Sequence, residues 1–514
     1  MHVTQALHRL LQQEPDRPLT VFNGRVRTVA ESADRVARLA GALRSAGAGA
    51  GDRVGMLSLN SDRFHEFLLA VPWAGAVVNP VNIRWSPAEV AYSLVDCDTR
   101  VLLVDDAFAP VIPELRERAP GLQTVIFCGD GPQPGGTLHY EELAAENPPA
   151  QDARRGGRDL YGVFYTGGTT GDPKGVMLSH DNLLASFLGV AAAGLVSQGG
   201  RLLHAAPMFH LAAGSAWLAG MFTGCTHVIV PVFTPAAVAA VISEHKVTDV
   251  LLVPTMIQML IDAPQTAGAD LTSVQRVIYG ASPISAAVLE RARKRLESAA
   301  FIQAYGMTEL APAATLLTPA DHDDPALAQS AGRAAAHVEI AVVGPDDTEL
   351  PRGRVGEVVV RGDNVMVGYW NKPEQTAAAL RGGWMHTGDA GYLDDRGYLF
   401  IVDRLKDMII TGGENVYSAE VENALAGHPA VAACAVIGVP DPTWGERVHA
   451  VVVLQPGREV TGEELREFCR GQIAGYKLPR SVAFADALPI SGAGKVLKRE
   501  LRKPYWDTAG RNIS

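Results

Sequence analysis

YTGGTTGDPKG, residues 165–175, gathers four glycines, three threonines and one lysine into a short stretch. A loop of this composition can wrap phosphate with backbone N–H groups and threonine hydroxyls. In the P-loop of nucleotide hydrolases, Gly-Lys-Ser/Thr opens a helix, whereas Lys174 stands here between a proline and a glycine. The strand-like run GVMLSH follows, and a helix capped by Ser179 or Asp181 is expected only after it. We therefore predict that this Gly/Thr loop joins two strands, with a plain surface loop as the alternative.

Around the loop, short buried strands alternate with helical patterns for most of the chain. Such alternation is typical of mainly parallel sheets covered by helices on both faces. Helical spacing is found at residues 28–46 and 87–95. Strands are expected at residues 53–57, 76–78, 101–104 and 124–127 in one α/β unit, and at residues 201–203, 226–230, 249–253 and 276–279 in a second.

The pattern changes from about Glu339, where short alternating strands broken by Gly and Asp predict a small antiparallel or barrel-like unit. Beyond Asp403 a small α+β domain of about 110 residues is expected, with helices at residues 418–426 and 461–471 and strands at 433–437 and 449–454. A chain of 514 residues is too long for one core. The expected fold class is α/β: a large N-terminal domain with two α/β sheets and a small β-barrel, then a small α+β C-terminal domain.

Composition narrows the class of protein. Apolar residues make up 47% and charged residues 20% of the chain, as in soluble globular proteins. The 45 basic and 56 acidic residues leave a net charge of −11, which argues against a general nucleic-acid binder. Five cysteines lie far apart without CxxC pairing, so a zinc site or disulfide framework is not expected.

The N-terminal stretch predicts an amphipathic helix rather than a signal peptide, and no apolar run reaches membrane-spanning length. A cytoplasmic protein is expected. The oligomeric state stays open, with a homodimer among the options.

Three motifs further along the chain carry chemistry. In QAYGMTE, residues 303–309, a carboxylate beside phosphate would be repelled unless a metal mediates, so Glu309 is a candidate Mg²⁺ ligand. In WMHTGD, Asp389 can accept hydrogen bonds from ribose hydroxyls, and in PISGAGK, Lys495 stands on a Gly-rich turn ahead of a basic helix. Taken singly, each residue is more typical of a bland role: Glu309 of a solvated glutamate, Asp389 of a turn and Lys495 of a surface lysine.

In their order and spacing, the motifs resemble those of the adenylate-forming superfamily: acyl-CoA synthetases, peptide-synthetase adenylation domains and firefly luciferase. The resemblance runs nearly end to end. It implies an enzyme that joins a carboxylate to ATP, releases pyrophosphate and passes the acyl group of the adenylate to a thiol. It further implies ATP, Mg²⁺ and coenzyme A as cofactors or co-substrates, an adenylation domain at residues 1–402, and a mobile domain at 403–514 with its hinge at Asp403.

Carried over motif by motif, the resemblance implies a set of ATP contacts. The β- and γ-phosphates would be held by Thr166, Gly167, Gly168, Thr169, Thr170, Gly171 and Lys174. Adenine would lie between Gly280, Ala281 and Ser282 on one side and Gln303, Ala304 and Tyr305 on the other. Thr308 and Lys495 would contact the α-phosphate, Glu309 would bind Mg²⁺, and Asp389 and Arg404 would hold the ribose. The family usually has Ser where this chain has Gly167, which removes one hydroxyl donor to phosphate.

The resemblance also assigns the second half-reaction and the acyl pocket. Pantetheine would pass close to Gly412 and Gly413, and the CoA nucleotide would be held by Trp444, Tyr476 and Arg480; an ordinary packing tryptophan is the alternative for Trp444. His210 would orient the carboxylate or gate the acyl pocket, with a buried structural histidine as the alternative.

The residues expected around that pocket are mostly small or apolar and include no Lys or Arg, which disfavours a dicarboxylic acid; they lie at 207–214, 279–281 and 306–312. The pocket also lacks the Trp with which acetyl-CoA synthetases close it. A medium-chain fatty acid or an aryl acid such as a benzoate or cinnamate is therefore expected.

Three other functions are weighed against this one. A peptide-synthetase adenylation domain would use a pocket Asp to hold an α-amino group, and we identify none. An acyl-AMP ligase would load a carrier protein instead of CoA. A noncatalytic binding protein of the same fold would be expected to lose Lys495, Glu309 or Asp389, and all three are present.

Overall fold

The computed structural model describes residues 1–167, 173–282, 284–490 and 496–506. The chain divides into one unit made of Met1–Ile340 with Val360–Met385 and another made of Ala341–Val359 with His386–Ser514. The first unit is therefore not contiguous in sequence. The division expected at Asp403 stays a prediction.

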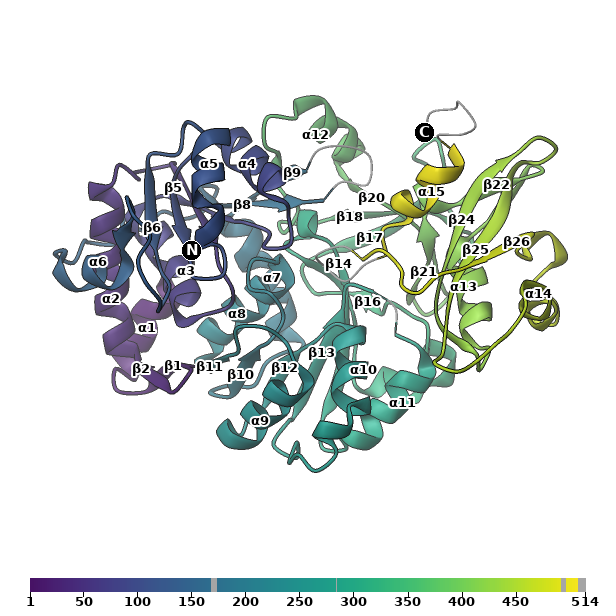
Figure 1. Cartoon of the computed structure of the whole chain (residues 1–514), viewed down its shortest axis with the longest axis horizontal. Helices are drawn as coiled ribbons and strands as arrows, with labels where there is room; N and C mark the ends of the chain where they lie inside the picture. The colour runs from purple at the N-terminus through teal and green to yellow at the C-terminus, as the bar shows by residue number, and fades with distance from the viewer. Residues whose placement is uncertain (168–172, 283, 491–495, 507–514) are drawn as a thin grey trace. The chain divides into compact units, whose positions relative to one another are not determined.

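One sheet of the first unit carries the Gly/Thr loop. Its strand order is β19-β9-β8-β4-β3-β5-β6-β7. Strands β5, β6, β8 and β9 of this sheet are labelled in Figure 1. The inner strands from β8 to β6 run parallel, whereas β9 is antiparallel to both β8 and β19. The bounds are β3 Arg53–Leu57, β4 Val77–Pro80, β5 Thr99–Val104, β6 Thr124–Phe127, β7 Leu138–His139, β8 Leu160–Thr166, β9 Lys174–Ser179 and β19 Gly368–Tyr369.

The second sheet of this unit has the order β16-β15-β14-β13-β12-β10-β11-β1-β2. Its strands from β14 to β1 run parallel to one another, whereas β15 and β2 are antiparallel to β14 and β1. The bounds are β1 Pro18–Phe22, β2 Arg25–Thr28, β10 Arg201–His204, β11 Thr226–Ile229, β12 Asp249–Leu251, β13 Arg276–Gly280, β14 Ala300–Gly306, β15 Ala313–Leu317 and β16 Arg333–Ala334. The two expected α/β sheets are thus confirmed.

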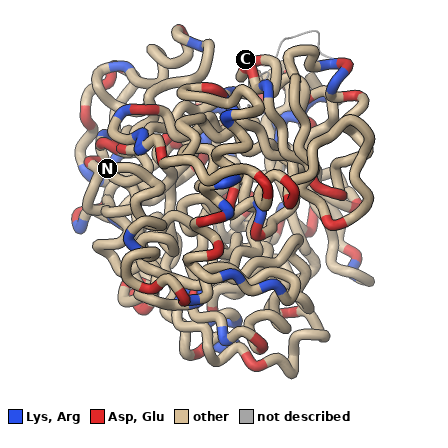
Figure 2. The backbone as a smooth tube through the Cα atoms, turned by 90° about the vertical axis from the view of Figure 1, so that its left-hand side faces the viewer, with Lys and Arg blue, Asp and Glu red and all other residues tan. Residues whose placement is uncertain are grey.

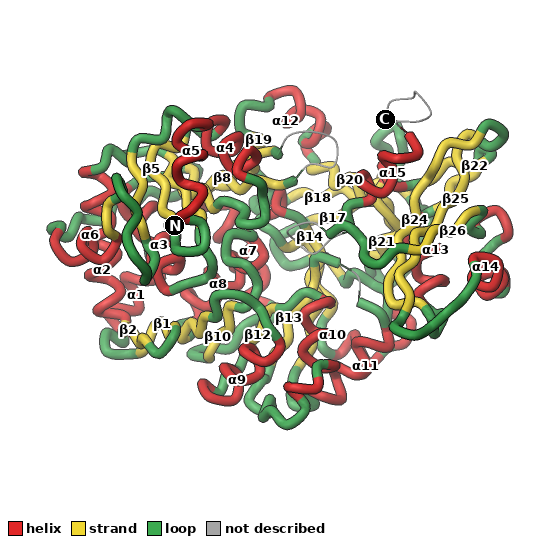
Figure 3. Tube along the Cα trace, viewed as in Figure 1, coloured by secondary structure: helices red, strands yellow, loops and turns green. Residues whose placement is uncertain are grey.

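Helices cover both faces of the second sheet (Figure 3). Helices α9, α10 and α11 pack on one face, and α7 and α8 on the other. The helices of this unit are α1 Gln5–Gln13, α2 Val29–Ser45, α3 Asp62–Ala74, α4 Pro87–Asp96, α5 Ile112–Arg118, α6 Tyr140–Glu146, α7 His180–Ala192, α8 Leu211–Thr223, α9 Pro235–His245, α10 Pro254–Asp262, α11 Ala286–Arg295 and α12 Pro373–Ala379.

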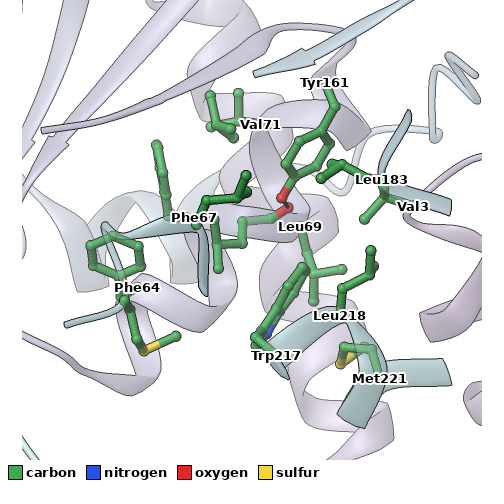
Figure 4. Close-up of a cluster of buried hydrophobic side chains, with 14 of the residues drawn as sticks. Val3, Phe64, Phe67, Leu69, Val71, Tyr161, Leu183, Trp217, Leu218 and Met221 are labelled. Carbon is green, nitrogen blue, oxygen red and sulfur yellow. Dashed lines mark hydrogen bonds between the residues drawn. The ribbon is translucent and has the colours of Figure 1, made fainter. Parts of the chain in front are cut away.

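The main core lies between the two sheets, where α3, α7 and α8 meet. Phe64 and Phe67 of α3 pack there with Trp217 of α8 and with Tyr161 of β8 (Figure 4). Burial of these large side chains stabilises the folded state, since each contributes roughly 1.5–3 kcal/mol. The same core therefore fixes β8, and with it one side of the Gly/Thr loop.

Three buried histidines lie beside that core. Trp217 donates its indole N–H to Nδ1 of His65 over 2.9 Å, and the rings of His204 and His227 are hydrogen-bonded over 2.8 Å. His65 and His227 also make an edge contact, and the Nε2 atom of each has no hydrogen-bond partner. Burial lowers the pKa of His65 and of His204 to about 3, and lowers that of His227 as well. All three are therefore neutral at pH 7 in the folded protein.

Charged residues are interspersed along the backbone in Figure 2, and some of them form a buried network. The carboxylate of Glu66 accepts hydrogen bonds from Arg27 and Arg35 over 2.7 and 2.6 Å. It also accepts one from the hydroxyl of Tyr140 over 2.6 Å. A buried carboxylate is tolerated only with such partners, so this network ties β2, α2, α3 and α6 together.

The second unit is smaller. A sheet in the order β17-β18-β20-β21 holds most of its residues in this unit and corresponds to the expected barrel-like unit: β17 Glu339–Val343, β18 Gly356–Arg361, β20 Met385–Leu393 and β21 Leu399–Arg404. A further sheet has the order β23-β22-β25-β24, with β26 on β25: β22 Ile409–Thr411, β23 Glu414–Val416, β24 Val431–Asp441, β25 Gly445–Leu454 and β26 Ser481–Phe484. Its helices are α13 Ser418–Ala426, α14 Gly462–Arg470 and α15 Lys498–Trp506.

Among the residues that the structure describes, none of the helices has both the length and the apolar character needed to span a bilayer. The five cysteines are free thiols. The expected amphipathic helix at the N-terminus is α1, whose buried residues are Ala6, Leu7 and Leu10.

Candidate active site

The Gly/Thr loop joins two antiparallel strands, as predicted. Thr166, the last residue of β8, lies opposite Lys174, the first residue of β9, and Tyr165 lies opposite Gly175. Helix α7 begins only after β9, and its N-cap is Ser179. The helix-opening geometry of a P-loop is therefore excluded here. The expected phosphate contacts Gly168, Thr169, Thr170 and Gly171 lie outside the described residues.

A short segment, residues 366–370, links this loop to the turn that carries Glu309; we call it the brace. Trp370 N–H donates to the carbonyl of Gly175 over 2.7 Å. At the other end of the brace, Met366 N–H donates to the carbonyl of Glu309 over 2.9 Å. The backbone thus places the base of the Gly/Thr loop and the expected metal carboxylate next to each other.

Glu309 lies in a 3₁₀ turn, Thr308–Leu310, directly after β14. Its side chain is buried, at 7% exposure, and Oε1 accepts a hydrogen bond from the hydroxyl of Tyr369 over 2.8 Å. Burial, with Glu309 beside it, raises the pKa of Tyr369, so the phenol stays protonated and donates. Among the described residues, no Lys or Arg forms an ion pair with Glu309. A carboxylate oxygen is a ligand that Mg²⁺ prefers, so the chemistry of Glu309 fits this metal.

The two segments expected around adenine lie on neighbouring parallel strands. Gly280 at the end of β13 pairs with Ala304 of β14. A Cβ atom at Gly280 would approach the carbonyl oxygen of Ala304 to 2.1 Å, so only glycine fits there. Ala281 has a φ of 65°, and Ser282 follows it. Gln303 and Tyr305 flank Ala304, and the buried Oε1 of Gln303 has no hydrogen-bond partner. In α/β sheets, nucleotides usually bind at the carboxyl ends of the parallel strands, where these two segments lie.

His210 caps a helix. Its Nδ1 accepts a hydrogen bond from Ala212 N–H over 3.3 Å at the start of α8. The segment before it is held by Asn60, whose side-chain amide donates to the carbonyl of Ala206 over 3.0 Å and accepts from Met208 N–H over 2.7 Å. The capping contact gives His210 a structural role, and its role toward the acid stays a prediction.

In the second unit, the two residues expected at the ribose are paired. Asp389 of β20 lies opposite Arg404 of β21, and Nε of Arg404 is 2.6 Å from Oδ1 of Asp389. The Asp389 side chain is 7% exposed, and its backbone N–H donates to Thr387. Asp403, the expected hinge, accepts hydrogen bonds from the backbone N–H and the hydroxyl of Ser418 at the start of α13.

Some of the residues expected at coenzyme A lie close together: Gly412, Trp444 and Arg480. Gly412 and Gly413 form the turn of the β22–β23 hairpin with φ values of 61° and 83°. A Cβ atom at Gly412 would come within 2.7 Å of the Trp444 ring. The guanidinium of Arg480 lies 4.5 Å from the centre of that ring.

Trp444 is 42% exposed, so it is not a core tryptophan. Tyr476 is 40% exposed, and no contact of it with Trp444 or Arg480 is found among the described residues. Lys495 lies outside the described residues.

Sequence reasoning missed Tyr369 and Asn60. Both make contacts with residues far away along the chain, and neither stands in a sequence pattern that signals polar function. Tyr369 follows a glycine in an apolar stretch and reads as a core residue.

Comparison with known proteins gives the family. The model of the AMP-binding enzyme family matches residues 7–370, and that of the AMP-binding enzyme C-terminal domain matches residues 420–495. A feruloyl-CoA synthase of Amycolatopsis sp is 42% identical over 97% of this chain and 98% of its own length. The fatty acid–[acyl-carrier-protein] ligase ScoC of Streptomyces coeruleorubidus is 37% identical over 98% of this chain and 96% of its own.

Among solved structures, the amide bond synthetase McbA from Marinactinospora thermotolerans is 33% identical and superposes with a TM-score of 0.87. That match covers 98% of this chain and 100% of the other. Both family models and full-length relatives thus agree with the motif order along the chain. The protein belongs to the AMP-binding enzyme family, the adenylate-forming superfamily that its motifs resemble.

Proposed function

We propose that this protein is an ATP-dependent acid–CoA ligase that acts on an aryl carboxylic acid of the cinnamate class. The observation that supports the proposal is the brace, which is hydrogen-bonded to a buried Glu309 at one end and to the base of the Gly/Thr loop at the other. The feruloyl-CoA synthase of Amycolatopsis sp, similar over nearly the whole chain, supports the choice of acid. A cytoplasmic location would supply both ATP and CoA.

In the first half-reaction, a carboxylate oxygen of the acid attacks the α-phosphorus of ATP. The bond from that phosphorus to the bridging oxygen breaks, and pyrophosphate leaves. Two anions must approach each other, so cationic groups are needed around phosphorus. We assign Lys174 to the leaving pyrophosphate and Lys495 and Thr308 to the α-phosphate. Glu309 would hold Mg²⁺, which supplies positive charge at the phosphate oxygens.

In the second half-reaction, the CoA sulfur attacks the acyl carbon, loses its proton, and AMP leaves. We propose that the C-terminal domain turns about Asp403 between the two steps, a hinge-type change. Asp389 and Arg404 would hold the ribose, with Arg404 presenting a two-donor fork. The stacked pair of Trp444 and Arg480 presents an aromatic face and a cation, which suits the nucleotide of CoA.

A second candidate acceptor follows from the similarity to ScoC, which is named as a ligase for a carrier protein. CoA is favoured because Trp444 and Arg480 stand exposed and stacked, and a carrier protein has no adenine nucleotide to bring there.

The test is a screen for acid-dependent pyrophosphate release with cinnamates, benzoates and medium-chain fatty acids. We expect release with a cinnamate-type acid and an acyl-CoA product when CoA is added. Release without any acyl-CoA, together with loading of a carrier protein, would favour the second candidate. If no acid caused release, the ligase assignment itself would be wrong.

Gly167→Ser is expected to lower the KM for ATP about fivefold, because one added hydrogen bond to phosphate contributes about 1 kcal/mol. A Cβ atom at Gly167 would meet no described atom within 4 Å outside its chain neighbours, so the serine fits without strain. Steady-state kinetics at saturating acid would measure the change, with the KM for the acid as the internal control. An unchanged KM for ATP would show that the missing hydroxyl has no consequence.

A further inference from the structure

Tyr369 contacts two residues that the proposed reaction needs, one through its hydroxyl and the other through its ring face. Its hydroxyl donates to Oε1 of Glu309 over 2.8 Å. Its ring face lies under the ammonium group of Lys174, with Nζ 5.0 Å from the ring centre. One buried side chain therefore touches both the expected metal carboxylate and the expected phosphate lysine.

Backbone hydrogen bonds hold Tyr369 in that place. Its strand, β19, pairs with β9, so that Tyr369 lies opposite Val176, two residues beyond Lys174. Its N–H donates to the hydroxyl of Thr376 over 2.9 Å. The rest of the brace bonds to Glu309 at one end and to Gly175 at the other.

If Lys174 and Glu309 formed an ion pair with each other, that pair would compete with the binding of phosphate by Lys174 and of Mg²⁺ by Glu309. A carboxylate and an ammonium group that lie close together attract each other, and a partly buried pair would be hard to separate. Among the described residues, neither Lys174 nor Glu309 forms an ion pair. Tyr369 instead gives each of them a neutral partner: a hydrogen bond for the carboxylate and a π face for the ammonium.

Such neutral partners orient a charge without neutralising it. A cation–π contact contributes about 1 kcal/mol, so phosphate can draw the lysine away. The hydrogen bond to Oε1 leaves the other carboxylate oxygen for a metal, and outer partners of this kind fix the orientation of metal ligands.

We propose that Tyr369 is a positioning residue for Mg²⁺–ATP, which keeps Lys174 and Glu309 apart and oriented so that one meets phosphate and the other meets the metal. The proposal rests on the proposed function. It adds a residue that the motif resemblance does not include.

The experiment measures ATP binding by calorimetry to the full chain, with neither acid nor thiol present. The dissociation constant of ATP is determined in Mg²⁺ and again in EDTA, and the ratio of the two is the readout. Tyr369→Phe keeps the ring and loses the hydroxyl, so we expect the Mg²⁺-dependent gain in affinity to fall about tenfold while the affinity in EDTA is unchanged. Tyr369→Leu also loses the π face, so the affinity in EDTA should fall as well.

The matched control is Tyr140→Phe, which removes another buried tyrosine–glutamate hydrogen bond, that to Glu66. It should leave both dissociation constants unchanged. A double-mutant cycle with Glu309→Gln separates positioning from general stability: once Glu309 is neutral, Tyr369→Phe should cause no further loss of the Mg²⁺-dependent gain. Thermal unfolding of each variant verifies that it is folded.

The outcomes are distinct. A folded Tyr369→Phe variant with the wild-type ratio overturns the positioning role, and so does an equal further loss in the Glu309→Gln background. Wild-type protein that binds no ATP would contradict the proposed function itself rather than the role of Tyr369.

Discussion

Lys495→Ala is expected to stop acyl-adenylate formation while thioester formation from a supplied acyl-adenylate continues. The first half-reaction brings a carboxylate to a triphosphate, and a positioned cation offsets their repulsion and the charge that develops at phosphorus. A donor of this kind is worth about 3 kcal/mol, or roughly a hundredfold or more in rate. The second half-reaction starts from a bound adenylate and does not need that cation.

The two half-reactions are measured separately: pyrophosphate release from acid and ATP, and acyl-CoA formation from synthetic acyl-adenylate and CoA. Lys503→Ala is the control, because it removes an exposed positive charge from α15, in the same C-terminal segment. It should change neither rate. An equal loss of both half-reactions in Lys495→Ala would refute the assignment of this lysine.

Acid should unfold the first unit through its buried histidines. His65 and His204 have pKa values of about 3 in the folded protein because burial disfavours their charged form. In the unfolded chain the pKa is about 6.5, so the unfolded state binds more protons between pH 6.5 and 3. Stability is therefore fully present above pH 6.5 and falls as the pH drops below it. At pH 4.5 the titration of each of these two histidines lowers the free energy of unfolding by roughly 2 to 3 kcal/mol relative to its value above pH 6.5.

The charged groups near the three buried histidines also lower the pKa values of these histidines. Arg27 lowers the pKa of His65, Arg17 lowers that of His227, and the histidines disfavour protonation of one another. His65→Gln tests the effect, since the amide can still accept from Trp217 but does not titrate.

We expect this variant to be less stable than wild type at pH 7.5 and to lose less stability between pH 7.5 and 4.5. Denaturant unfolding followed at both pH values measures the difference. If wild type and variant lost the same amount, the histidine would not be the titrating group.

Local elements could be predicted where the pattern is strong. The β-branched runs predict strands at residues 53–57 and 124–127, and β3 and β6 have those bounds. Helix α13 likewise occupies the predicted residues 418–426. In each case the signal lies within the element and the residues that flank it, so the information is local.

The order of strands could not be predicted in the same way. Thr20 of β1 lies opposite His227 of β11, and β2 closes the edge of the same sheet. A pattern of period two predicts a strand and its buried face, but it does not identify the neighbouring strand. Long-range pairing depends on the packing of the whole unit.

The site shows the same limit. Glu309 could be named from charge, because a carboxylate next to phosphate needs a cation. Tyr369 could not, since its hydroxyl finds Glu309 only after the chain returns to β9. The contact of Trp444 with Gly412 is likewise set by the fold rather than by spacing.

The first unit consists of two segments that are separated in sequence, and this affects the order in which its parts are synthesised. The ribosome completes residues 1–340 before it makes the brace, which belongs to the later piece, Val360–Met385. Until then β9 is an edge strand with exposed backbone groups, a template for pairing with other chains, and Glu309 has no tyrosine beside it. The nascent protein thus completes the candidate nucleotide site late, and any fragment cut at Ile340 for laboratory work would carry the Gly/Thr loop without the strand β19 that pairs with β9.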